Sequence, residues 1–74
     1  MIHCTTYTDS QGKPLGYFME FQNVTEEKDG IVKPVRFAQE FLVQDYMILK
    51  AQEMSERYTV GIVYKTEVDP DYLA

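Results

Sequence analysis

The side chains that could carry out covalent chemistry are few. His3 and Cys4 are the only histidine and the only cysteine of the 74-residue chain. A thiol next to an imidazole base is an arrangement that nucleophilic enzymes use. However, adjacent residues of a strand point to opposite faces of a sheet, so these two side chains are not expected to form a hydrogen bond. We therefore expect Cys4 to be a small core residue and His3 to face solvent or cap an end, and the sequence predicts no enzymatic activity.

Metal and cofactor sites are not expected either. A structural zinc site needs about four cysteine or histidine ligands, which the chain does not have. The four glycines are scattered, at positions 12, 16, 30 and 61, and form no phosphate-binding loop. Carboxylates form two loose clusters, which we interpret as solvated acidic surface; the second alternates like a calcium loop but lacks the central glycine and the bidentate glutamate. The first cluster is Glu26, Glu27 and Asp29, and the second is Glu67, Asp69 and Asp71.

The composition narrows the classes of partner. Twelve acidic and seven basic residues give a net charge of −5, which argues against direct binding to nucleic acid or to anionic membranes. A hydrophobic content of 45% is too high for a disordered chain. The N-terminus lacks the basic and apolar regions of a signal peptide, and one unpaired cysteine suits a reducing compartment. We expect a soluble cytoplasmic protein whose residues 1–74 form a single domain.

The order of apolar and turn-forming segments predicts an α+β fold of the type ββαβ. Strands are expected at residues 2–8 and 16–24, a polar loop at 25–30, a helix at 34–56 and a strand at 57–68. A right-handed crossover places the last strand beside the first, giving a three-stranded sheet of order 2-1-3 with the helix on one face. The other sheet face has no cover. A short strand at 31–36, paired through an Asp29-Gly30 turn, competes with the start of the helix.

The predicted helix has apolar residues on two sides. The stripe that includes Phe37, Phe41 and Ile48, widened on one flank by Leu42 and Leu49, is expected to pack on the sheet. A second stripe on the opposite side is expected to contact another protein or a second copy, because a helix that is apolar on two sides is usually buried on two sides. The alternative is that loops, or the C-terminal tail through Tyr72 and Leu73, cover it. The predicted interface residues of the second stripe are Val43, Met47 and Met54, with Tyr46 between the two stripes. Asp45 projects inside the first stripe and is included as a specificity contact in case that stripe faces an interface.

These features predict a small protein that acts by binding another protein and that forms a homodimer. Short acidic chains without catalytic motifs are often regulators or inhibitors of larger protein machines, and phage-encoded antagonists of host proteins are one example of that class. One alternative is a nucleic-acid mimic, whose two acidic clusters would occupy a DNA- or RNA-binding groove of a host protein. A second alternative is a small subunit or accessory domain of a larger complex. No small-molecule substrate is expected.

Overall fold

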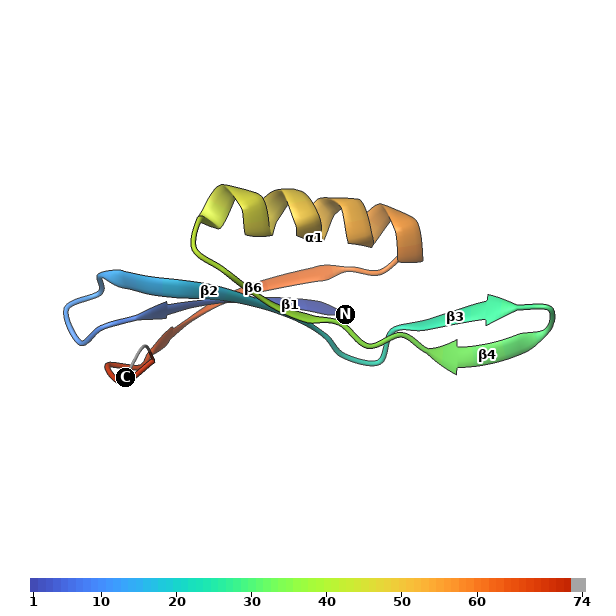
Figure 1. Ribbon diagram of the computed structural model, residues 1–74, viewed down its shortest axis with the longest axis horizontal. Coiled ribbons are helices and arrows are strands. Elements are labelled where there is room, and N and C mark those ends of the chain that lie inside the picture. Colours follow the sequence, from blue (N-terminus) through green and yellow to red (C-terminus); the bar gives the residue numbers. More distant parts are fainter. Residues whose placement is uncertain (73–74) are drawn as a thin grey trace.

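The computed structural model describes residues 1–72, which form one helix on one face of a mixed four-stranded sheet, with a separate two-stranded sheet beside it (Figure 1). The four-stranded sheet has the order β5-β2-β1-β6. The predicted α+β fold and the order 2-1-3 are confirmed by β2, β1 and β6, while β5 is a strand that the sequence did not predict. The elements are β1 (Ile2–Thr8), β2 (Pro14–Phe21), β3 (Thr25–Lys28), β4 (Ile31–Pro34), β5 (Ala38–Phe41), α1 (Gln44–Tyr58) and β6 (Ile62–Val68).

The first hairpin forms because β-favouring residues flank a segment rich in turn formers. β1 and β2 pair antiparallel, with Ile2 opposite Phe21 and Cys4 opposite Met19. In the turn, the Asp9 carboxylate accepts hydrogen bonds from the backbone N–H groups of Gln11 (2.9 Å) and Lys13 (2.8 Å). Asp9 therefore satisfies backbone donors that the tight connection would otherwise leave unpaired.

The second half of the chain crosses over to the far side of β1. Helix α1 leads into β6, which runs parallel to β1 without a shift of register from Ile2 opposite Ile62 to Thr8 opposite Val68. A parallel pair needs such a long connection, and the helix supplies it. At 15 residues α1 is too short to cross a membrane, and the part of the chain described has no longer helix.

The hydrophobic core lies between α1 and the sheet. β1 and β2 contribute alternate residues, as a strand with one covered face should. The aromatic ring of Phe21 lies at the centre of an apolar cluster, 5.2 Å from the ring of Phe37 and 5.7 Å, edge-on, from that of Tyr58. The buried apolar side chains are Ile2, Cys4, Met19, Phe21, Val24, Phe41, Met47, Ala51 and Met54.

The predicted start of the helix at residue 34 is wrong, because the helix begins ten positions later, at Gln44. The competing strand was the better interpretation: residues 31–34 form β4, and Ala38–Phe41 form β5, in which Phe41 pairs with Tyr17. Val43 precedes the helix in an extended conformation and provides no side-chain cap. No helix breaker separates residues 34 and 44, yet pairing with β2 makes part of this stretch a strand. Its β-branched and aromatic residues favour that conformation.

The helix ends at Tyr58 because the next residue, Thr59, adopts a left-handed conformation with φ 54° and donates its N–H to the Ser55 carbonyl. This closes the last turn of α1. The strand predicted from residue 57 consequently begins at Ile62.

A two-stranded arm, residues 25–34, replaces the predicted polar loop. β3 and β4 pair antiparallel through a turn in which Asp29 (φ 54°) and Gly30 (φ 79°) both have positive φ, the geometry of a two-residue hairpin turn. All eight strand residues of the arm are exposed. The arm extends the molecule to 49 × 20 × 16 Å (Figure 1). Its radius of gyration of 14.0 Å exceeds the value of about 11 Å expected for a compact chain of this length.

Candidate protein-interaction surface

The side of α1 that faces the sheet is defined by Met47, Ala51 and Met54, which are 1%, 0% and 7% exposed. The prediction that Met47 and Met54 form an outer interface is therefore wrong, since both are core residues. The predicted orientation relied on Phe37 and Phe41, which lie before the helix and do not share its periodicity. Within the observed helix, Met47, Ala51 and Met54 recur at the spacing of one helical face.

The apolar residues that α1 leaves exposed lie at its N-terminal end. Leu42 and Val43, in the link from β5, are 84% and 46% exposed, and Tyr46 and Leu49, in the first turns of α1, are 65% and 61% exposed. We call these four residues the helix patch. Val43 and Tyr46 were predicted to belong to an interface, and both are accessible; Leu42 and Leu49 were predicted to lie in the core, and the structure places them in solvent.

Asp45 does not lie inside an apolar stripe, as the sequence predicted, but is exposed in the first turn of α1. A carboxylate at this position interacts favourably with the positive end of the helix dipole. This interaction partly compensates for the missing side-chain cap at Val43. Asp45 also adds a negative charge beside the helix patch.

His3 and Cys4 point to opposite faces of β1, as the sequence predicted. Cys4 is 1% exposed and packs beneath α1 with Ile2, whereas His3 is half-buried on the other face. Burial raises the pKa of the Cys4 thiol. A reactive thiolate requires a lowered pKa and access to solvent, so the surroundings of Cys4 favour a structural role.

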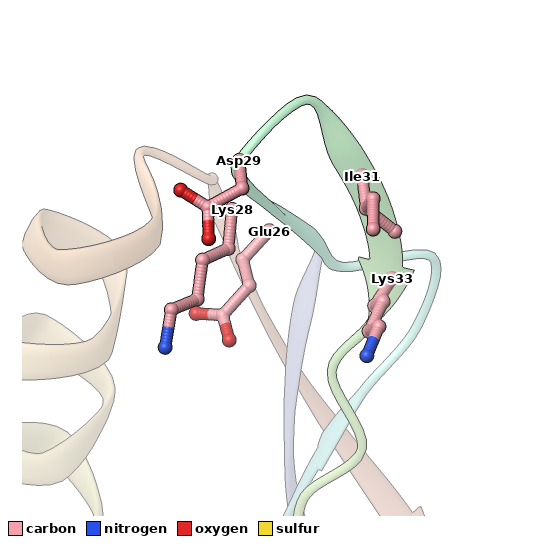
Figure 2. A pocket seen from close by; sticks show the side chains of 5 residues that line it. All are labelled: Glu26, Lys28, Asp29, Ile31 and Lys33. Carbon is pink, nitrogen blue, oxygen red and sulfur yellow. The ribbon is translucent and has the colours of Figure 1, made fainter.

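The two acidic clusters lie at opposite ends of the long axis (Figure 1). On the arm, Glu26 is directly opposite Lys33. The arm has a pocket of about 250 Å³, and its two lysines lie among its two carboxylates (Figure 2). Among residues 1–72, no group of three His, Cys, Asp or Glu side chains is placed to hold a metal ion. The pocket is lined by Glu26, Lys28, Asp29, Ile31 and Lys33.

The second cluster is engaged in local contacts at the end of β6. Glu67 forms an ion pair with Lys65, with 3.2 Å between Oε1 and Nζ. Asp69 accepts a hydrogen bond from the backbone N–H of Asp71 (3.2 Å), which closes the C-terminal turn. These carboxylates therefore have basic or backbone partners nearby, as the arm carboxylates have lysines.

The sheet face opposite α1, the open face, is covered only at one corner by the described residues. There the ring of Tyr72 stacks on Tyr7 with 4.5 Å between centroids and approaches Gly16 so closely that a Cβ atom there would collide with it. Tyr72 thus lies on the sheet and not on α1, where the sequence allowed it; Leu73 lies outside the described residues. The Tyr72 hydroxyl is buried and has no hydrogen-bond partner among residues 1–72.

Within residues 1–72, no strand pairs with the outer edge of β6, which is the last strand of the sheet. Tyr64 and Val68 are 54% and 65% exposed along this edge. A groove of about 570 Å³ separates the edge from the start of α1. It is lined by Thr6, Gln44, Ile48, Tyr64, Lys65 and Thr66.

Comparison with protein families, with curated proteins and with solved structures finds no significant match for this chain. The chemistry of the exposed surfaces is therefore the basis for a functional proposal. The helix patch, the arm and the β6 edge are the accessible features that the core does not require. The exposure of Leu42 and Leu49 was not predicted from the sequence. The Asp29-Gly30 turn was the signal that could have indicated it, because a hairpin at this turn makes the helix begin later and changes which residues face the sheet.

Proposed function

We propose that this protein is a non-enzymatic regulator or inhibitor that acts by binding another protein through the helix patch. The observation that carries the proposal is the exposure of four neighbouring large apolar side chains, Leu42, Val43, Tyr46 and Leu49, by 46–84%. Exposed apolar patches of this kind mark interaction sites on soluble proteins. Burying one such side chain fully contributes about 1.5–3 kcal/mol, so two or three of them would support a specific complex.

The surroundings of the patch indicate the chemistry of the partner. Asp45 and Glu53 are exposed on α1 beside the apolar residues, and the whole chain carries a net charge of −5. We therefore infer a partner with an apolar groove that accepts a helix and has a basic rim. Recognition of a helix face by a groove is a common mode of protein binding.

We place this activity in the cytoplasm, which the unpaired, buried Cys4 supports because a reduced thiol persists there. The alternative function, a small subunit of a larger complex, would use the same helix patch. It differs from a regulator in how long the partner stays bound and not in which residues bind it. The acidic mimic has less support: its two clusters lie at opposite ends of the molecule, and lysines alternate with the carboxylates on the arm.

The test is affinity capture from a lysate of the native source, performed in parallel with the unaltered protein and with the double variant Tyr46→Ala/Leu49→Ala. Both side chains are exposed, so the variant should fold normally while losing the captured protein. The matched control is Gln52→Ala/Glu56→Ala, which changes two exposed polar residues of the same helix and should retain it.

A captured protein that binds the Tyr46/Leu49 variant as well as the unaltered chain would contradict the helix patch. The variant Glu26→Lys/Glu27→Lys/Asp29→Lys separates the alternatives: its binding should be unchanged if the patch is responsible. Loss of binding in this variant alone would instead favour the acidic mimic.

A further inference from the structure

The unpaired edge of β6 has its own pattern of charged and apolar side chains. Tyr64, Thr66 and Val68 lie on the side of the sheet that carries α1, because they pair with the even-numbered residues of β1 that include the core residue Cys4. Lys65 and Glu67 lie on the open face. All five of these residues are exposed, and seven residues is a long strand to leave unpaired at an edge.

The backbone groups of β6 show which residues can bond to another strand. At one end of the β1–β6 ladder, Ile2 donates to the Gly61 carbonyl (2.9 Å), and at the other end Asp69 donates to the Thr8 carbonyl (2.7 Å). In a parallel ladder without a shift of register, every second residue bonds to the neighbouring strand. The odd-numbered residues of β6 therefore direct their backbone N–H and C=O groups toward β1. Tyr64, Thr66 and Val68 direct theirs outward, away from β1.

We propose that the occupant of this edge is a second copy of the chain, with the two β6 strands antiparallel and Thr66 opposite Thr66. In this register Lys65 lies opposite Glu67 of the second copy, and the same contact recurs on the other side of the two-fold axis. Tyr64 lies opposite Val68, so the exposed apolar side chains also pair. The backbone groups that Tyr64, Thr66 and Val68 direct outward then form the hydrogen-bonded pairs between the two copies. Lys65 and Glu67 occupy the non-hydrogen-bonded positions, where opposite side chains are closer together.

Charge complementarity selects this register over its neighbours. Moving the axis to residue 65 places Lys65 opposite Lys65, and moving it to residue 67 places Glu67 opposite Glu67. Like charges directly opposite each other in adjacent strands are destabilising, whereas opposite charges stabilise the pair. The register centred on Thr66 is the one of the three that pairs every charge with its opposite.

Two other features leave room for the second copy. The C-terminal turn folds back (Figure 1). Tyr72 stacks on Tyr7 of β1, which is an inner strand of the sheet, and so lies away from the outer edge of β6. The groove between α1 and β6, about 570 Å³ in volume, lies on the same side of the sheet as Tyr64 and Val68. Joining the two edges makes one continuous sheet with both helices on one face, and this contact does not involve the helix patch.

The test measures molecular mass by light scattering coupled to gel filtration. The unaltered protein should have a mass near twice 8.7 kDa, and a monomer over the whole accessible concentration range would overturn the proposal. Lys65→Glu and Glu67→Lys should each raise the dissociation constant of the dimer on the order of tenfold or more, because each places like charges opposite each other. The double variant Lys65→Glu/Glu67→Lys should restore the dimer.

Thr66→Pro provides an independent variant. It removes an outward N–H at the two-fold axis, so the dimer should be lost while the circular dichroism spectrum of the folded chain is retained, since proline is tolerated on edge strands. A dimer that survives both Thr66→Pro and the single charge variants would exclude β6 as the interface. If only the helix-patch variant Tyr46→Ala/Leu49→Ala produced a monomer, the patch and not the edge would be the self-association surface.

Discussion

Met47 and Leu49 lie two residues apart on α1 and have opposite environments. Met47 is 1% exposed against the sheet, whereas Leu49 is 61% exposed. Met47→Ala should lower the free energy of unfolding by about 2–5 kcal/mol, because it leaves a cavity in the core. Leu49→Ala should change it by less than about 0.5 kcal/mol. Urea denaturation of the two variants measures both values, and equal losses would contradict the orientation of α1.

Tyr72 provides a pH-dependent contact at residue scale. Burial, and then the nearby Glu40 carboxylate, raise the pKa of Tyr72 from 10.0 to about 12. The folded state therefore favours the neutral phenol: its contribution to stability is complete below pH 10 and is lost as the pH rises toward 12. We expect the C-terminal turn to detach from Tyr7 in this interval.

Tyrosinate absorbance and the NMR signals of Tyr7, followed through an alkaline titration, measure this detachment. Tyr72→Phe is the matched variant: it keeps the ring that stacks on Tyr7 but removes the ionisable hydroxyl. It should be about as stable as the unaltered protein below pH 10, because the stacked contact is retained, and it should not lose stability between pH 10 and 12. Unaltered pH-dependent loss of the turn in this variant would show that another group is responsible.

At the scale of elements, the arm is separable from the rest of the fold. Its eight strand residues are all exposed, and at its base the N–H of Val35 donates to the carbonyl of Val24 (2.8 Å). The two ends of the arm are therefore already adjacent. Replacing residues 25–34 with Asn-Gly, which favours a two-residue hairpin turn, should leave the thermal midpoint of unfolding nearly unchanged.

Calorimetry or circular dichroism measures that midpoint. The control is Asp9→Ala in the β1–β2 turn, which removes the carboxylate that accepts hydrogen bonds from the backbone N–H groups of Gln11 and Lys13 and should lower the midpoint. A large loss of stability in the armless variant would mean that the arm contributes to the core through contacts beyond Val24 and Val35.

The elements that could be predicted are those specified by local signals. Alternating apolar residues identified β1, β2 and β6, and the handedness of crossovers gave their order. The start of α1 could not be derived in the same way, because Val43 offers no capping side chain and the run from 34 to 44 lacks a helix breaker. Only pairing with a distant strand, Phe41 opposite Tyr17, determines that this stretch is β5.

At the scale of the whole molecule, the distribution of surfaces could not be predicted because it depends on that one boundary. The predicted helix included residues 34–43, and its apolar face was oriented from Phe37 and Phe41. Because these residues lie before the observed helix, the buried face of α1 contains Met47 and Met54, and Leu49 is exposed. The uncovered sheet face was predicted correctly from a single helix, except at the corner that Tyr72 occupies. Apart from Met1, the exposed large apolar side chains consequently lie in three separate places: the helix patch, the β6 edge, and Ile31 and Val32 of the arm.

The exposed arm also has a kinetic consequence. A two-stranded hairpin with no hydrophobic face packed on a core is only marginally stable in water. Its strands should therefore open and close many times without unfolding of the main sheet, and their amide protons should exchange with solvent far faster than those of β1. Binding of any ligand to the arm would appear first as slower hydrogen exchange at residues 25–34, which makes this segment a built-in reporter of occupancy.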